Sequence, residues 1–339
     1  MRRALLFGFA LTLAAVGACR SVPEHPANLD GVKIPNVGSP GITADAGTDG
    51  TVPLGTFATV PNTRGLTLFG GYLYISSIGA GASTGYLARV PAAGGAMETL
   101  AENLTEPWAI AANDTFIGFT TASSATGGGG VYDFLLGDTS VTTLTPAVSG
   151  AYGFVMDASA VYYTEGTGTL GVERRSLTTT AVDRIVTSSV LATGNALLIS
   201  GQDLFVAASN GIVYRAPVLG GVLEPLDFPL AGSIADIALD TTTVYATVDL
   251  PSPNGAIMAF PKLGGAGKVL VSGLDRPARI AVDGSRVIYT NPTTGTVEAV
   301  STAGGTPVTL ATGLDAPYAL AVGDAVYVGT TTAVFRVAK

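Results

Sequence analysis

The feature that most constrains the fold is a repeat of about forty residues, and its clearest copy spans residues 277–316. Within this copy, four short apolar runs are separated by turn residues such as Asp283-Gly284 and Gly304-Gly305. These glycines supply the positive φ that tight hairpins need, and the runs are rich in Val, Ile, Tyr and Thr, as strands are. Four antiparallel strands at this period are typical of one β-propeller blade.

The unit recurs along residues 52–339, and each copy opens with a candidate innermost strand. These strands are expected to begin near Gly65, Trp108, Tyr152, Ala196, Ile234, Ala278 and Tyr318. The seventh unit reaches Lys339 after three strands, and residues 55–60 resemble the missing fourth. We therefore predict an all-β, seven-bladed β-propeller with three-plus-one closure by the N-terminal strand, which would remove an open sheet edge.

The chain ahead of the repeats divides into two segments. Residues 1–18 combine Arg2 and Arg3 with an apolar run from Ala4 to Ala18, which is shorter than the roughly 20 residues that a membrane span requires. This pattern predicts a secretory signal peptide. Residues 19–51 contain several prolines and glycines and no apolar periodicity, so they are predicted to be a tether to the propeller at 52–339.

The end of the signal segment, Val16-Gly17-Ala18-Cys19, resembles the lipobox of bacterial lipoproteins. The resemblance implies cleavage before Cys19, lipidation of its sulfur, and a membrane contact through that anchor. Arg20 stands where inner-membrane lipoproteins usually carry aspartate, which by the same analogy implies an outer-membrane lipoprotein facing the periplasm or the exterior. Cys19 is the only cysteine, so no intramolecular disulfide can form.

The strand sequences YYTE (162–165) and IYTN (288–291), with IAVD (280–283), resemble YWTD and NHL propeller repeats. Families with such repeats include receptor and sensor domains, virginiamycin B lyase and gluconolactonase-type hydrolases. The lyase depends on a propeller histidine, whereas the single histidine here, His25, lies in the tether. The lactonases bind a divalent metal through Glu, Asn and Asp, and nothing in the spacing marks such ligands here. We therefore predict no catalytic residue, no metal site and no cofactor.

The charge balance limits the class of partner. Without Arg2 and Arg3, the 17 Lys and Arg residues fall to 15, against 25 Asp and Glu. An acidic surface disfavours nucleic acid and anionic membrane as partners. We expect a monomer that binds a protein, a glycan or a small molecule.

A ligand is expected at the mouth of the central channel, where loops and innermost strands meet. Aromatic and charged residues fall at these positions: Trp108, Tyr152, Asp236, Arg279 and Tyr318. Aromatic side chains with a few polar groups suit a sugar, a peptide or a small apolar ligand. The alternative is that the aromatics only plug a narrow channel. Alignment of the innermost strands also predicts an ion pair between Asp236 and Arg279.

Asp157, Asp240 and Asp283 occupy matching positions after the first strand, where a ring of acids or a set of turn residues is possible. The turn interpretation is favoured, because aspartate bonds readily to nearby backbone in turns. At the level of the whole chain, the first hypothesis is a membrane-anchored, non-catalytic binding or sensor lipoprotein of the cell envelope. The alternatives are a lactonase- or lyase-type enzyme and a scaffold subunit of an envelope complex.

Overall fold

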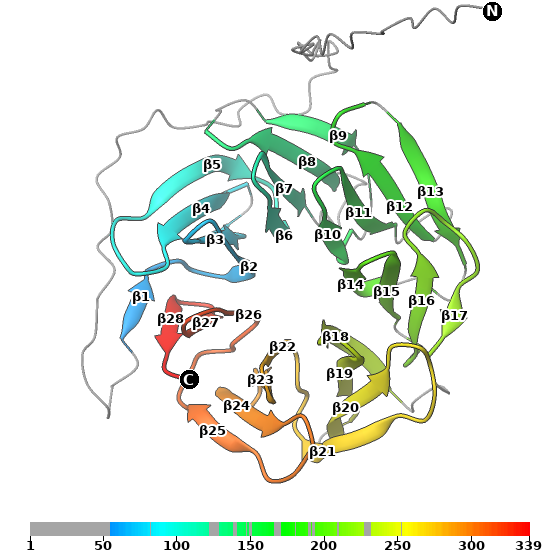
Figure 1. Ribbon diagram of the computed structural model, residues 1–339. Helices are drawn as coiled ribbons and strands as arrows, with labels where there is room; N and C mark the ends of the chain where they lie inside the picture. The colour runs from blue at the N-terminus through cyan, green and yellow to red at the C-terminus, as the bar shows by residue number, and fades with distance from the viewer. Residues whose placement is uncertain are drawn as a thin grey trace, which may run out of the picture.

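The computed structural model describes residues 55–81, 83–121, 129–137, 141–146, 148, 151–165, 171–179, 181–188, 191, 194–208, 210–226, 232–251 and 253–339. The predictions for the signal peptide, the tether, Cys19 and His25 lie outside these residues. The described chain forms seven four-stranded antiparallel sheets arranged in a ring (Figure 1). The predicted seven-bladed β-propeller is confirmed. None of the described residues belongs to a helix with the length and apolar character of a membrane span.

Each blade takes four strands, numbered outward from the channel. Blade 1 contains β2 (Thr63–Phe69), β3 (Tyr72–Ser77), β4 (Gly85–Pro91) and β5 (Glu98–Leu104). Blade 2 contains β6 (Pro107–Ala112), β7 (Phe116–Thr121), β8 (Gly130–Leu135) and β9 (Thr142–Pro146). Blade 3 contains β10 (Phe154–Met156), β11 (Ala160–Glu165), β12 (Gly171–Ser176) and β13 (Val182–Thr187).

The second half of the ring repeats this order. Blade 4 contains β14 (Gly194–Ser200), β15 (Asp203–Ala208), β16 (Val213–Pro217) and β17 (Glu224–Pro225). Blade 5 contains β18 (Ser233–Leu239), β19 (Thr243–Asp249), β20 (Gly255–Pro261) and β21 (Lys268–Leu274). Blade 6 contains β22 (Ile280–Asp283), β23 (Arg286–Asn291), β24 (Thr296–Ser301) and β25 (Val308–Ala311).

Blade 7 joins the two ends of the described chain. Its inner strands are β26 (Ala319–Val322), β27 (Val326–Gly329) and β28 (Val334–Val337), and its outer strand is β1 (Thr56–Ala58). β1 pairs antiparallel with β28, so the predicted three-plus-one closure is confirmed. Phe57 is 2% exposed and its ring meets Tyr327 edge-on, at 5.1 Å between centroids, so the closing strand also contributes to the core.

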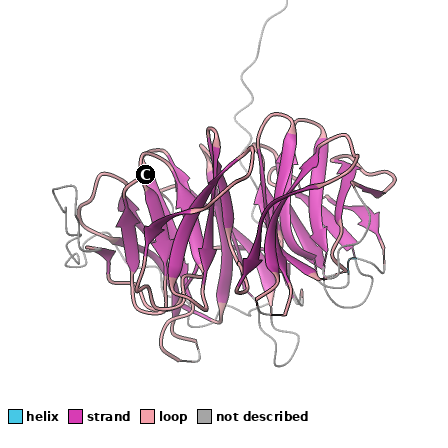
Figure 2. Ribbon diagram, turned by 90° about the horizontal axis from the view of Figure 1, so that it is seen from below, coloured by secondary structure: helices cyan, strands magenta, loops and turns pink. Residues whose placement is uncertain are grey.

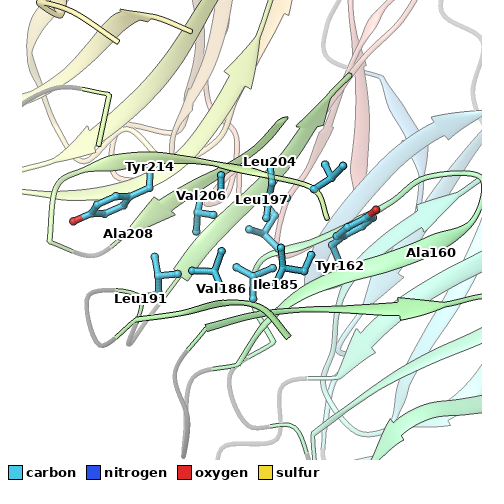
Figure 3. Packing of buried hydrophobic residues seen from close by; sticks show 13 residues of the cluster. Ala160, Tyr162, Ile185, Val186, Leu191, Leu197, Leu204, Val206, Ala208 and Tyr214 are labelled. Carbon is cyan, nitrogen blue, oxygen red and sulfur yellow. The ribbon is translucent and has the colours of Figure 1, made fainter. Parts of the chain in front are cut away.

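The hydrophobic core lies between neighbouring blades rather than inside a single sheet. In the described residues, a buried apolar cluster occupies each of the seven interfaces around the ring. Figure 3 shows the interface of blades 3 and 4, where Tyr162 and Ile185 from one blade pack near Leu197 and Val206 from the other. Middle strands are therefore covered on both faces, which explains their continuous apolar sequences.

The hairpin turns follow the predicted chemistry. Gly284, Gly304 and Gly305 have φ of 60°, 85° and 130°, in the left-handed region that favours glycine. Asp157 Oδ1 accepts bonds from the backbone N–H of Ser159 and Ala160, and Asp240 Oδ1 accepts them from residues 242 and 243. The turn interpretation is therefore confirmed for these two aspartates. Asp283 differs, because its carboxylate pairs with Arg286 and with the side chain of residue 339.

The antiparallel order gives the ring two loop faces, which are seen edge-on in Figure 2. We call the face at which the innermost strands begin the mouth face. β1 is the fourth strand of blade 7, so it starts at the opposite face and runs toward the mouth face. The chain thus enters the propeller on the side away from the channel mouth.

Candidate functional site

The mouth face holds a cavity of about 240 Å³ over the innermost strands. Four of the five residues predicted for ligand binding line it, namely Trp108, Tyr152, Asp236 and Arg279. Arg64 of β2 lines it as well. Apolar side chains from several blades complete the wall: Leu66, Ile110, Phe154, Leu197, Leu198, Ile237, Ile280 and Leu320. Residues more than two hundred positions apart in sequence therefore share one small chamber.

Local irregularities in the innermost strands position the side chains of Arg64 and Trp108. The pairing of β2 with β3 shifts register between Thr63 and Gly65, so Arg64 lies in a bulge. The pairing of β6 with β7 shifts between Pro107 and Ile110, so Trp108 also lies in a bulge. A bulge bends its strand and redirects a side chain, and such bulges are common next to functional sites.

Hydroxyl groups on the second strands hold the same part of the innermost strands. Thr120, Thr247 and Thr290 accept bonds at Oγ1 from the backbone N–H of Ala109, Asp236 and Arg279, at 3.2, 2.9 and 3.0 Å. Gly153 donates to Thr164 in the same way. Asp236 and Arg279 therefore occupy equivalent positions on neighbouring blades, as the alignment of the repeats predicts.

Hydroxyl groups on two of the second strands also reach the next blade. Ser76 Oγ of blade 1 donates to the carbonyl of Trp108 in blade 2 at 2.7 Å. Thr247 Oγ1 of blade 5 donates to the carbonyl of Ala278 in blade 6 at 2.9 Å. These bonds join blade 1 to blade 2 and blade 5 to blade 6 at the strands that carry the site.

Aromatic contacts link four blades around the mouth. The Arg64 guanidinium carbon lies 5.4 Å from the Trp108 ring centroid and 5.3 Å from the Tyr318 ring centroid. Trp108 in turn meets Tyr152 edge-on, with 5.2 Å between centroids and an interplanar angle of 70°. The order Tyr318, Arg64, Trp108, Tyr152 therefore follows blades 7, 1, 2 and 3. Cation–π attraction explains the position of Arg64 between two rings.

The predicted ion pair between Asp236 and Arg279 is wrong, because each group has other partners in the structure. Asp236 Oδ1 accepts a bond from Ile237 N at 3.0 Å, and Oδ2 accepts one from Ile280 N at 3.2 Å. Arg279 Nε instead donates to the carbonyl of Tyr318 at 2.9 Å. No ion pair within 4.0 Å joins Asp236 to Arg279, both of which are among the described residues. The positive charge of Arg279 nevertheless acts at longer range to lower the pKa of Asp236.

Burial shifts two ionisable groups of the chamber. It raises the pKa of Asp236 above its ordinary value, in spite of Arg279 and the two backbone N–H donors. It lowers the pKa of Arg64, and repulsion from Arg279 acts in the same direction, although guanidinium remains charged at neutral pH. The chamber therefore combines two guanidinium groups with one carboxyl group whose pKa is raised by burial.

Arg64 is not among the residues that the sequence predicts for ligand binding. The missing signal is the bulge at Arg64, which no composition or period reveals. Tyr318, which was selected, is 40% exposed and contributes its ring to Arg64 and its carbonyl to Arg279. It belongs to the rim of the chamber and holds the two arginines in place.

The fold and this central chamber define the class, a seven-bladed β-propeller with a cavity at its channel mouth. No protein-family model matches the sequence. No curated protein matches it either.

Solved structures share the fold at low sequence identity. The extracellular domain of the putative one-component system BT4673 from B. thetaiotaomicron is 12% identical with a TM-score of 0.63, over 84% of this chain and 39% of that one. The computationally designed Ika8 protein is 16% identical with a TM-score of 0.59, over 80% of this chain and 82% of that one. A chain of a nidogen–laminin complex is 19% identical with a TM-score of 0.50, over 65% of this chain and 84% of that one. These likenesses show the propeller fold.

Proposed function

We propose that this chain is a non-catalytic binding or sensor module of the bacterial cell envelope that recognises a small ligand at the channel mouth. The observation that carries the proposal is the chamber of about 240 Å³, in which aromatic, cationic and carboxyl groups from separate blades converge. Ligand sites in proteins are typically concave and mostly apolar, with a few placed polar groups. The bacterial extracellular domain among the structural neighbours supports an envelope setting for the same fold.

The chamber argues for binding rather than catalysis. Its lining offers a single carboxyl group, Asp236, and each oxygen of that group already accepts a backbone N–H. No serine, cysteine or histidine is among the lining residues that the structure describes. A nucleophile with an adjacent base is therefore missing from the chamber wall, whereas binding requires no such pair.

Trp108 allows a direct test of ligand binding. It is the only tryptophan in the chain and lines the chamber, so its fluorescence reports on this site alone. We expect a small-molecule library to yield compounds that change Trp108 emission saturably and raise the melting temperature. Trp108→Ala should lower the affinity for those compounds by tenfold or more, as measured by the smaller rise in melting temperature. If no compound in a broad library changes either signal, the binding function is wrong.

The position of the anchor is part of the same proposal. Lipidation of Cys19 would tether the propeller to the outer membrane, and the chain enters the propeller on the face opposite the chamber. That arrangement leaves the mouth face open to ligand. Cys19→Ser should move the protein from the membrane fraction to soluble fractions, or leave it uncleaved with its signal attached. Membrane partitioning that is unchanged in mature Cys19→Ser protein would contradict the lipid anchor.

A further inference from the structure

The chamber contains a cation, Arg64, that forms no close ion pair with a described carboxylate, although Glu106 acts on it at longer range to raise its pKa. Ion pairs engage Arg89, Arg174, Arg184 and other basic residues at the surface. Arg64 has no ion pair within 4.0 Å among the described residues. Its Nε is buried without a hydrogen-bond partner, although a buried polar atom without a partner is costly. Arg64 lines the cavity, and no hydrogen bond of the described chain engages its terminal guanidinium nitrogens, so these are the donors that a bound ligand would meet.

A second guanidinium increases the positive potential of the same chamber. Arg279 lines the cavity and acts to lower the pKa of Arg64, as a like charge does. Its Nε donates a hydrogen bond to the carbonyl of Tyr318, which orients the guanidinium group but adds no negative charge. Two guanidinium groups in a partly buried site favour an anion, because guanidinium forms strong, charge-assisted bonds to carboxylate and phosphate.

The remaining lining limits the size and charge of that anion. The volume of about 240 Å³ lies below the usual range for drug-sized ligands, so the chamber suits a small molecule rather than a peptide or an oligosaccharide. Trp108, Tyr152 and the apolar wall would surround the ligand's uncharged body. Asp236 also faces the chamber, and in its ionised form it would repel a second acidic group or a dianion.

From these observations we infer that the ligand is a small organic monocarboxylate, whose carboxylate binds Arg64 and whose apolar or aromatic body packs against Trp108 and Tyr152. The inference rests on the proposed binding function and names the class of ligand for that site. Arg64 is held between two rings before the ligand arrives, so little side-chain freedom remains to be lost on binding. A hydroxyl or amino group at the far end of the ligand would face Asp236.

The test uses shape-matched probes that differ in charge. The probes are benzoate with benzamide, phenylacetate with phenylacetamide, and glucuronate with glucose, together with phenyl phosphate. Binding to the propeller is measured by Trp108 fluorescence and by calorimetry. At least one carboxylate should bind at least about tenfold more tightly than its neutral partner, as expected for a charge-assisted hydrogen bond in a partly buried site.

Two arginine variants identify the group responsible. Arg64→Gln should abolish the preference for carboxylate over its neutral partner, so that both bind equally weakly. Arg276→Gln is the matched control, because Arg276 is 65% exposed, pairs with Asp249 and does not line the chamber. This variant removes the same charge from the protein and should keep the preference. Melting temperatures of both variants check that the fold is intact.

The outcomes separate the ligand class from the proposed function. Neutral probes that bind as tightly as carboxylates, or a preference that survives Arg64→Gln, would overturn the carboxylate while leaving a ligand-binding chamber. Tighter binding of phenyl phosphate than of every carboxylate would make the anion a phosphate and overturn the inference too. A chamber that responds to no compound in the broad library contradicts the proposed function itself.

Discussion

Single polar residues at the ends of strands stabilise this fold through small groups of hydrogen bonds. Asp240 is an example: Oδ1 holds the turn through two backbone N–H groups, and Oδ2 accepts the hydroxyl of Tyr245 at 2.7 Å. Burial raises the pKa of Asp240, but the bonds from Tyr245, Thr242 and Thr243 outweigh it and bring the pKa below its ordinary value. Burial and the same bond raise the pKa of Tyr245 to about 12.

A pH-dependent effect follows for Asp240. Because its pKa is lower in the folded state than in the unfolded state, its charge stabilises the fold above the unfolded pKa of about 3.9. That stability is lost as pH falls below this value through the folded pKa. Asp240→Ala should lower the free energy of unfolding by about 1 kcal/mol at pH 7, as expected for loss of a partly buried hydrogen-bond acceptor.

Urea denaturation at pH 7 and at pH 3 measures this effect. Asp240→Asn is the control, because an amide oxygen can still accept the two turn bonds while the charge is removed. Its deficit should be smaller than that of Asp240→Ala at pH 7, and it should shrink at pH 3. A deficit of Asp240→Asn that grows toward acid would contradict the assignment of a lowered pKa.

At the scale of strands, close approach between neighbouring blades decides where glycine is required. Gly85 and Gly255 open the third strands of blades 1 and 5, and each stands against the proline that opens the next blade. A Cβ at Gly85 would lie 2.4 Å from Cδ of Pro107, and one at Gly255 would lie 2.5 Å from Cδ of Pro277. These glycines therefore serve packing between blades, and neither has a positive φ.

Gly255→Ala should accordingly destabilise the fold. Adding a methyl group against a proline ring and backbone forces the strands apart, at a cost of about 1–3 kcal/mol. Gly81→Ala is the control, since its Cβ would meet only Thr84, at 3.9 Å, and its φ is ordinary. Chemical denaturation of both variants should show a loss for Gly255→Ala and almost none for Gly81→Ala. Equal stabilities would show that the blades tolerate the added methyl group.

At the scale of the whole molecule, the ring depends on β1. Phe57 and Val60 are 2% and 0% exposed and belong to the cluster between blades 7 and 1. Removing residues 1–60 should delete the pairing of β1 with β28 and this apolar burial, which lowers the free energy of unfolding by several kcal/mol. Removing residues 1–50 should leave the melting temperature unchanged.

A point variant checks this closure without truncation. Phe57→Ala should cost about 3–5 kcal/mol, the usual range for loss of a buried phenyl ring. Equal melting temperatures for the full chain and for the chain without residues 1–60 would mean that β1 does not close the ring. The shorter truncation guards against an effect of the N-terminal segment that is unrelated to pairing.

Local sequence signals are enough to predict the blades, their number, their closure and the face that carries the chamber. These follow from period and turn chemistry, which are local: Asp240 and Gly284 mark turns wherever the chain places them. Equivalent positions in successive copies then meet at the axis by symmetry, which is why Trp108, Tyr152, Asp236 and Arg279 were predicted together and do share one cavity.

Only the tertiary structure decided how these side chains are engaged. Arg279 bonds to the carbonyl of Tyr318, Asp236 accepts backbone N–H groups, and Arg64 lies between two rings from different blades. Each of these partners is set by a bulge or by contacts between blades. The alternative partners of one side chain differ little in energy, so the local sequence does not select among them. Alignment of repeats gives the position of a residue on its strand, whereas the partner of its side chain is selected by packing across the ring.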